Sequence, residues 1–243
     1  MNEFKKFILG LLVTLMIFSG FPTSTSILAQ VAERELDEEI TLFVDNDMNE
    51  QEEEAIIYEF MNTPDATLVF LFDEYSIEDV INSDANGKDM EEAPLLNRGV
   101  GVGWQFRVTR GAVGNSMADT TRTIGSAVNG QPGMNLSLSR TNSFSNSVTS
   151  TFGATNNMVT SSVGFSVTAS NSFTQSTSMV VPRTSGGRNV RSMTLRAHPY
   201  IRRTTFRTYR RHDSAASSAP WEFRGTGTAT RQLGIAFRHT INF

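Results

Sequence analysis

The stretch Ser137-Leu-Ser-Arg-Thr-Asn-Ser-Phe-Ser-Asn-Ser-Val-Thr-Ser-Thr151 decides the fold, because every odd position in it is serine or threonine. Leucine, phenylalanine and valine occupy even positions, together with one arginine and a few asparagine and serine residues. From Ser162 to Ser178 the same pattern returns with the parity exchanged. Successive side chains of a strand point to opposite faces of its sheet, so this period of two predicts amphipathic strands with a hydroxyl face and a mixed apolar face.

The two runs are expected to form one long antiparallel hairpin over residues 136–181. Gly153, Asn156 and Asn157 predict its turn within residues 153–161. Fifteen residues at about 3.3 Å per residue extend roughly 50 Å, whereas an ordinary strand has about five or six residues. The unusual length of the hairpin is therefore the feature that a function has to explain.

The N-terminus has the layout of a secretory signal peptide, residues 1–29. Lys5 and Lys6 precede an apolar run from Phe7 to Phe21, and small residues follow it. Cleavage after Ser26 or after Ala29 fits this layout equally well. The alternative is an uncleaved anchor, but the apolar run is short against the roughly 20 residues of a spanning helix. We therefore expect a secreted protein.

Charge divides the remaining chain into two parts. Residues 33–92 hold 21 acidic residues against one arginine and one lysine, a net charge of −19. Residues 97–243 hold 17 arginines, no lysine and three acidic residues, a net charge of +14. The chain has no cysteine, so disulfides do not stabilise it. We expect an acidic N-terminal segment over residues 30–95 and a basic domain over residues 96–243.

The acidic segment (residues 30–95) is expected to be a small α/β subdomain or a pro-region. Residues 38–44 and 66–72 look like short strands, and Asn49 to Met61 looks like a helix with Asn49 as its N-cap. The dense carboxylates are interpreted either as a solvated surface or as a shield that pairs with the basic domain of the same chain.

The basic domain is expected to be built from strands, without a helix. Alternation predicts strands at residues 104–109, 190–197, 201–209, 225–230 and 233–243, with His198-Pro199 interrupting the second and third. The expected fold class is mainly β: an elongated antiparallel sheet or sandwich with a long amphipathic hairpin, preceded by the small acidic α/β segment.

The sequence gives little support to catalysis. His198, His212 and His239 are not spaced as a metal site, so we expect no metal and no cofactor. His212, Asp213 and Ser214 are adjacent in one loop, but a catalytic triad is a spatial arrangement and adjacency is no evidence for one. We expect a protein that is not an enzyme.

The arginines of the basic domain suggest an anionic partner. Arginine pairs with the phosphates of nucleic acid, of lipid headgroups or of cell-wall polymers, or with the acidic segment of the same chain. A secreted chain without a recognisable nucleic-acid module favours the last three. The densest cluster supplies the candidate contacts to an anionic surface, and strand geometry divides it between two faces: Arg202, Arg203, Arg207, Arg210 and Arg211.

A long hairpin with few charges also has the pattern of a segment that inserts into a membrane. A spanning strand needs about 9–11 residues, and a hydroxyl face lines a channel without the desolvation cost of charge. Asn142, Asn146, Asn171 and Gln175 interrupt the apolar face, as does Arg140 near one end, and favour a sheet that remains in water. The candidate inserting or pore-lining residues are Ser143, Phe144, Ser145, Ser147, Val148, Thr149, Phe152, Val163, Phe165, Val167 and Phe173.

Residues 135–209 resemble the central region of the aerolysin and epsilon-toxin/mosquitocidal-toxin superfamily of β-pore-forming proteins. The resemblance lies in Ser143-Phe-Ser-Asn-Ser-Val-Thr149, Val163-Gly-Phe-Ser-Val-Thr-Ala-Ser-Asn-Ser-Phe173 and Met179-Val-Val-Pro182, about a third of the chain. The same residues are also similar to uncharacterised secreted proteins of Gram-positive bacteria. The superfamily implies long twisted strands, oligomerisation on a membrane and, in some members, proteolytic activation.

Two functions are therefore expected. The first is a secreted, non-enzymatic, pore-forming protein that acts on membranes as a homo-oligomer. The alternative is a secreted structural or cell-surface binding protein whose long sheet stays soluble. A third interpretation, a strand-built outer-membrane protein, draws on the alternating C-terminal strand that ends in Phe243.

Overall fold

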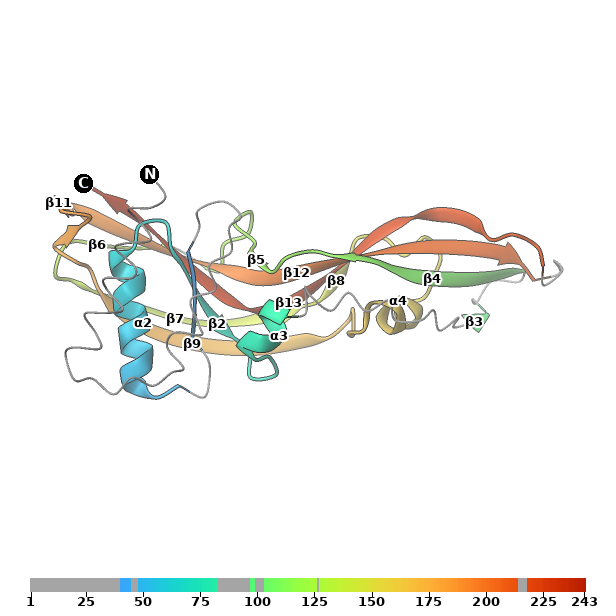
Figure 1. The fold of residues 1–243 in the computed structure, drawn as a ribbon, viewed down its shortest axis with the longest axis horizontal. Coiled ribbons are helices and arrows are strands. Elements are labelled where there is room, and N and C mark those ends of the chain that lie inside the picture. The colour runs from blue at the N-terminus through green and yellow to red at the C-terminus, as the bar shows by residue number, and fades with distance from the viewer. Residues whose placement is uncertain (1–39, 45–47, 83–96, 99–102, 126, 214–217) are drawn as a thin grey trace.

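The computed structural model describes residues 40–44, 48–82, 97–98, 103–125, 127–213 and 218–243. The expected signal peptide lies outside the described residues, as do residues 30–39, 45–47 and 83–95 of the acidic segment. The molecule is elongated, and two very long strands run along its length (Figure 1).

The two long strands are β12 (Ser192–His212) and β13 (Glu222–Asn242), which pair antiparallel over 21 residues each. At about 3.3 Å per residue, each extends roughly 70 Å. The expected separate strands at residues 225–230 and 233–243 are wrong, because β13 is continuous. The pairing register shifts by one residue at Leu233 and again at Arg224, so β-bulges absorb the change in pattern without ending the strand.

The expected interruption at His198-Pro199 is also wrong, because β12 continues through Pro199. The Pro199 carbonyl accepts a hydrogen bond from Asp119 N (2.8 Å), so it points away from β13. The nitrogen of Pro199 points to the same side of β12, because the N–H and C=O of one residue share a side in an antiparallel strand. Along that edge, β6 (Val128–Gly130) pairs with residues 193–195 and β5 (Met117–Ala118) with residues 200–201. The missing N–H of proline falls between these two short strands, where no ladder bond is lost.

The main sheet has the order β1-β2-β13-β12-β4-β3, and this mainly β architecture confirms the expected fold class. Short strands add to its edges, since β5 and β6 pair with β12, and β8 pairs with β13. The bounds of the remaining strands are β1 (Thr41–Val44), β2 (Thr67–Leu71), β3 (Asn97–Arg98), β4 (Trp104–Val113), β8 (Ser147–Val148), β10 (Thr184–Ser185) and β11 (Arg188–Asn189).

The described part of the acidic segment is built into this sheet. The expected helix is confirmed as α2 (Glu50–Asn62), whose N-terminus has a capping box between Asn49 and Glu52. The strands β1 and β2 lie on either side of α2 in sequence and pair parallel, and β2 pairs antiparallel with β13. A second helix, α3 (Ile77–Asn82), follows β2.

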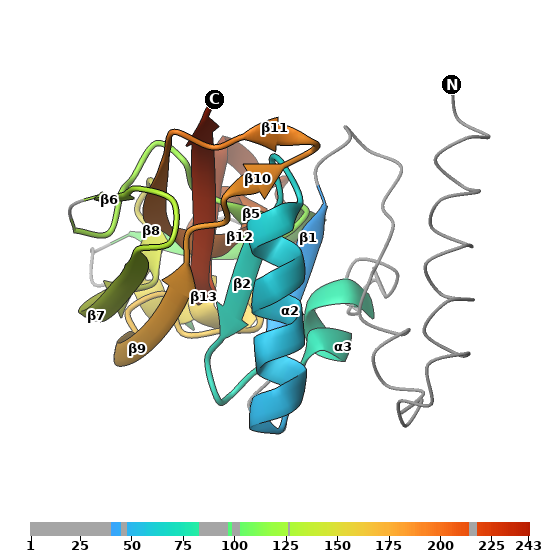
Figure 2. The ribbon, with the colours of Figure 1, turned by 90° about the vertical axis from the view of Figure 1, so that its left-hand side faces the viewer.

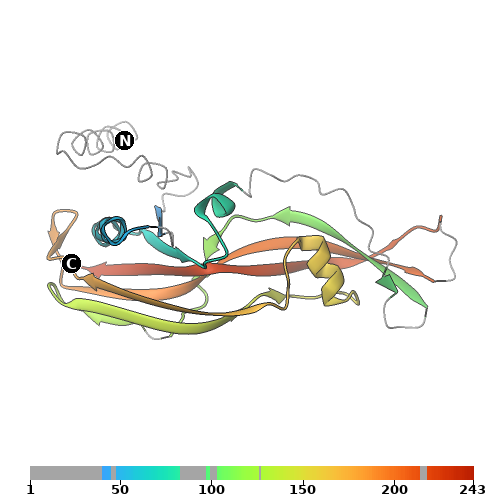
Figure 3. The ribbon, with the colours of Figure 1, turned by 90° about the horizontal axis from the view of Figure 1, so that it is seen from below.

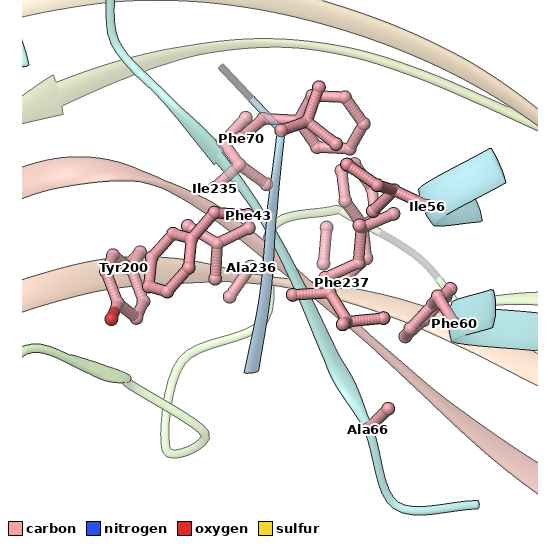
Figure 4. Packing of buried hydrophobic residues seen from close by; sticks show 14 of the residues in the cluster. Phe43, Ile56, Phe60, Ala66, Phe70, Tyr200, Ile235, Ala236 and Phe237 are labelled. Atoms are coloured by element: carbon pink, nitrogen blue, oxygen red, sulfur yellow. The ribbon is translucent and has the colours of Figure 1, made fainter. Parts of the chain in front are cut away.

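Among the described residues, the contacts between the two oppositely charged parts are mainly apolar. Phe70 of β2 packs edge-to-face on Phe237 of β13 (Figure 4). Phe60 of α2 packs on His239. The phenol of Tyr75 accepts a hydrogen bond from Arg231 Nε at 3.0 Å. Burial raises the pKa of Tyr75 to about 12, and its hydrogen bond with Glu74 adds to the rise, while the charge of Arg231 opposes it.

The long sheet has a separate hydrophobic cluster in each of its halves. The near half, where β13 ends, holds the large cluster around Phe237, Ile235, Leu68 and Phe60. The far half, next to the connection from β12 to β13, holds a small cluster of five buried residues: Val159, Val163, Val167, Phe206 and Ala229. The far half is therefore held by much less apolar burial than the near half.

Candidate functional site

The candidate site is a separate two-stranded sheet, β7 (Asn135–Ser145) with β9 (Ser170–Val180), here called the strand pair. The strands are antiparallel and in register over eleven residues each, from Asn135 opposite Val180 to Ser145 opposite Ser170. The structure confirms that the two hydroxyl-rich runs pair with each other. Within the described residues, the strand pair shares no ladder with the main sheet.

The outer face of the strand pair is a ladder of hydroxyl groups. Ser143 Oγ lies 3.1 Å from Ser172 Oγ, and Ser145 Oγ donates to Ser170 Oγ at 3.2 Å. The exposed hydroxyl residues of the described part of this face are Ser137, Ser143, Ser145, Ser170, Ser172, Thr174 and Ser178. Asn135 and Val180 are also exposed, at the end of the same face. The face is uncharged and solvated, as the period of two predicts.

The inner face of the strand pair packs on the core of the near half. Leu136, Phe144 and Met179 are buried, and the Phe144 ring lies 5.5 Å from that of Phe72. Seen along the long axis, β7 and β9 lie on one side of β13, and β2 and α2 lie on the other (Figure 2). The strand pair is therefore held to the main sheet by side-chain packing.

Residues 146–169, here called the connecting segment, join β7 to β9. We expected this region to be the rest of a hairpin with a turn at 153–161, and that expectation is wrong. The connecting segment contains β8, a crossing over the far half of the sheet, and a helix, α4 (Asn156–Val163). Figure 3 shows α4 against the far half of the long strands.

The helix α4 forms because local signals in this region favour it over a strand. The Thr155 side chain caps its N-terminus by accepting from Met158 N, and Gly164 ends it in the left-handed conformation. Met158, Val159 and Val163 then face inward. These three side chains have helical spacing, and the alternation of serine and threonine in this part of the sequence concealed it.

Polar contacts attach the connecting segment to β13. Gln232 N donates to Asn146 Oδ1 at 2.9 Å, and Asn146 Nδ2 donates to Ser166 O at 2.8 Å. β8 pairs with Ala229 and Thr230 of β13. Beyond it, Thr149 N donates to Thr228 O at 3.0 Å. Thr228 N also donates to Thr149 Oγ1 at 3.0 Å, and Thr208 Oγ1 of β12 donates to Thr151 O at 3.1 Å.

Glycines in β13 allow the connecting segment to lie directly on the sheet. A Cβ at Gly225 would come within 2.5 Å of the Phe152 ring, and one at Gly227 would meet the Phe206 ring and the Ser150 carbonyl. Phe152 itself has a positive φ of 50°, an unusual conformation for a bulky residue. The connecting segment can therefore cross the sheet at this point because Gly225 and Gly227 have no side chains. Phe152 adopts a strained backbone conformation in this crossing.

The eleven hairpin candidates lie in three different places. Ser143 and Ser145 are on the hydroxyl face, Phe144 is on the inner face, and the side chain of Phe173 lies outside the described part. Val163, Phe165 and Val167 belong to α4 and the turns after it, where they contact the far-half cluster. The others lie in β8 and the crossing, namely Ser147, Val148, Thr149 and Phe152.

The five candidate arginines also separate. Arg202 is 7% exposed, donates to Ser116 Oγ at 2.9 Å and donates to the Val80 carbonyl, so it is a structural residue and the expectation of a surface contact is wrong for it. Arg203 and Arg207 are exposed. Arg210 and Arg211 lie at the far end of β12, in contact with aromatic rings.

The histidines do not form a metal site. No group of three or more potential metal ligands lies together within the described residues. His198 Nδ1 lies 2.7 Å from the Arg122 carbonyl, and His212 packs on Trp104. Burial lowers the pKa of His239 to about 4, and its ring nitrogens have no hydrogen-bond partner among the described residues.

Among the described helices, none combines the length and the apolar composition that crossing a membrane requires.

Comparisons with known proteins give one structural match. No family model matches the chain, and no curated protein matches it. The crystal structure of a proposed pore-forming toxin from Bacteroides vulgatus ATCC 8482 matches with a TM-score of 0.29 at 6% identity, over 56% of either chain. The match therefore spans little more than half the length of that protein.

Proposed function

We propose that the protein is a secreted, non-enzymatic pore-former whose strand pair, β7 and β9, leaves the main sheet and enters a target membrane. One observation carries the proposal. The strand pair keeps its own eleven-residue ladder and shares no ladder with the main sheet in the described part of the chain. Backbone hydrogen bonds can therefore remain intact when the strand pair moves, which is a condition for crossing lipid.

The length and the hydroxyl face of the strand pair fit this role, whereas Arg140, Asn142, Asn171 and Gln175 on its other face favour the alternative given below. Eleven residues per strand correspond to the roughly 9–11 residues that a tilted strand needs to cross a bilayer. The hydroxyl face would line the water-filled side, and the face of Leu136, Phe144 and Met179 would meet lipid or a neighbouring copy. A single strand pair leaves two unpaired edges, so insertion requires several copies in one oligomer.

The position of the connecting segment determines the order in which parts of the molecule detach. Release of β7 and β9 requires that β8 and α4 first leave the far half of the sheet. The small cluster around Phe206 and the hydrogen bonds of Asn146 and Thr149 hold them there. We expect this detachment to come first, because the far half is the less stable part of the molecule.

The alternative function is a secreted structural or surface-binding protein whose sheet stays in water. The burial of Phe144 against Phe72 favours it, because this contact makes the strand pair part of the near-half core. Under this alternative, the hydroxyl ladder is a solvated outer face and the strand pair never detaches.

The experiment that separates the two functions places a probe at adjacent positions of β7. The chain has no cysteine, so Ser143→Cys and Phe144→Cys each create one labelling site for an environment-sensitive dye. In solution, the label at 143 is exposed and the label at 144 is buried. On anionic liposomes, a pore-former gives label 143 a water-accessible signal and label 144 a signal quenched by lipid-borne quenchers, together with release of an enclosed dye.

The result that contradicts the proposal is equally definite. If label 144 is never reached by lipid-borne quenchers and no dye is released at any lipid composition, the strand pair does not insert. The alternative function then stands.

A further inference from the structure

Both tryptophans of the chain lie at the same end of the molecule, the far end of the long strands. Trp104 begins β4 and pairs with His212, the last residue of β12. Trp221 immediately precedes β13. We call the described residues 103–107, 209–213 and 218–224 the aromatic end. It is the right-hand end of the molecule in Figure 1.

Arginines hold the aromatic rings of this end in place. The Arg210 guanidinium lies 4.0 Å above the Trp104 ring, and that of Arg211 lies 4.7 Å above the Trp221 ring. Arg210 Nε also donates to Glu222 Oε2 at 2.8 Å, and the hydrogen bond from Arg210 holds the pKa of Glu222 below its usual value. Cation–π contacts and a bidentate ion pair therefore fix the positions of both indoles.

Beside these rings lies an exposed apolar side chain. Phe223 is 54% exposed, although a ring contact with Tyr209 supports it at 5.6 Å. Its neighbour Arg224 is exposed and donates to Glu222 Oε1 at 3.0 Å. An exposed phenylalanine at the end of a sheet, among tryptophans and arginines, is a combination typical of binding surfaces.

The charge of the aromatic end is positive. Its four arginines, Arg107, Arg210, Arg211 and Arg224, stand against Asp213 and Glu222, which gives a net charge of +2 with histidine neutral. Tryptophan and tyrosine prefer the headgroup region of a bilayer, where one side of the ring is apolar and the other wet. Arginine binds phosphate oxygens in a bidentate manner. Aromatic rings and positive charge together fit an anionic phospholipid surface.

The connecting segment lies next to the aromatic end. A Cβ at Gly153 would come within 2.8 Å of the Phe106 ring, and Phe106 pairs with Arg210 in the β4–β12 ladder. A membrane that meets the aromatic end is therefore close to the segment that has to detach before β7 and β9 move.

We infer that the aromatic end is the surface with which the protein docks on anionic phospholipid, through Trp104, Trp221 and Phe223 in the headgroup region and Arg224 on lipid phosphate. This inference rests on the proposed function because it takes a membrane as the target. Beyond that function, the aromatic end is named as the part that binds the lipid surface, and its contact with the connecting segment explains how binding can act on that segment.

Intrinsic fluorescence tests the docking directly, because both tryptophans report on the aromatic end alone. The mature full chain is mixed with vesicles of phosphatidylcholine and phosphatidylglycerol, with and without brominated acyl chains. Docking predicts a blue shift of the emission and quenching by the brominated lipid. Phe223→Ser should weaken vesicle binding on the order of tenfold, since burial of a phenylalanine contributes about that much.

Two further variants test the charge and the position of the docking surface. Arg224→Gln should weaken binding roughly fivefold on anionic vesicles and have little effect on pure phosphatidylcholine. Tyr58→Ser is the matched control, because Tyr58 is 73% exposed on α2 in the other half of the molecule, and it should bind as the unsubstituted chain does. Circular dichroism of each variant confirms that it is folded.

The outcomes separate docking from pore formation. Quenching without dye release supports the docking and overturns the pore. Dye release without tryptophan quenching supports the pore and overturns the docking. Equal loss of binding in Phe223→Ser and Tyr58→Ser overturns the assignment of the surface.

Discussion

Phe206 lies directly opposite Gly227 in the β12–β13 ladder, and its buried ring occupies the space that a side chain at 227 would need. The Ser150 carbonyl of the connecting segment lies over the same glycine. Gly227 thus allows a close contact between the long sheet and the segment that crosses it. The stability of the connecting segment depends on this contact.

Gly227→Ala is expected to loosen the connecting segment. The added methyl group would overlap Phe206 and Ser150, an overpacking that costs on the order of 1–3 kcal/mol. Urea unfolding measures the loss, and limited proteolysis should cut first within residues 146–169. Thr226→Ala, at the exposed neighbouring position, is the control and should change stability by less than about 0.5 kcal/mol. Equal stability of both variants would contradict the account.

Phe144→Ala is expected to weaken the attachment of the strand pair. It removes a ring that is 5% exposed and that contacts Phe72, so we expect a loss of about 3–5 kcal/mol in the free energy of unfolding. If the strand pair detaches during function, the same change should also speed dye release from anionic liposomes. Ser143→Ala, on the exposed face, should leave both quantities nearly unchanged. Slower release by Phe144→Ala would argue against detachment.

His239 is expected to make the protein less stable in mild acid. Burial lowers its folded-state pKa to about 4 from an ordinary value of 6.5, so the unfolded chain binds the proton more tightly. The stabilisation is complete above pH 6.5 and is lost as the pH falls toward 4, a total of about 3 kcal/mol. Between pH 7 and 4, the measured free energy of unfolding should fall by about 3 kcal/mol more in the unsubstituted chain than in His239→Leu. An equal change in the free energy of unfolding of both proteins over this pH range would exclude His239.

A chain that begins at Asn97 is not expected to fold. The truncation removes β2, which pairs with Gly234 to Arg238 of β13, and it removes α2, whose Phe60 covers His239. A thermal unfolding scan should show no cooperative transition, whereas a chain that begins at residue 30 should show one. A stable, cooperatively folded product would instead support the interpretation of residues 30–95 as a pro-region.

The sequence was sufficient to predict the local features that carry their own signal. The period of two predicted β7 and β9, and Asn49 with Glu52 predicted the start of α2. It was insufficient where tertiary contacts decide. Pro199 stays within a strand only because its neighbours on that edge are short, and Arg202 is buried because Ser116 and Val80 provide its partners. Nothing local in the sequence marks either outcome.

The error at the connecting segment has the same origin. Thr155 and Gly164 are ordinary capping residues, and together they could have indicated α4. The serine and threonine alternation on either side concealed them, since such residues suit both a solvated strand and a helix terminus. The crossing itself follows from Gly225 and Gly227, far away in sequence, so no local pattern could have predicted it.

Two engineered disulfides test most directly whether the strand pair leaves the main sheet. Ser147 pairs with Thr230, so Ser147→Cys with Thr230→Cys ties the connecting segment to β13. Ser143 pairs with Ser172, so Ser143→Cys with Ser172→Cys ties β7 to β9 and leaves the strand pair free to move as a unit. Neither disulfide has a competing thiol, because the chain has no native cysteine.

Dye release from anionic liposomes is then measured for both variants, oxidised and reduced. We expect that the first variant releases dye only after reduction, and that the second releases dye in both states. Equal release by the oxidised and reduced forms of the first variant would contradict the claim that the strand pair leaves the sheet.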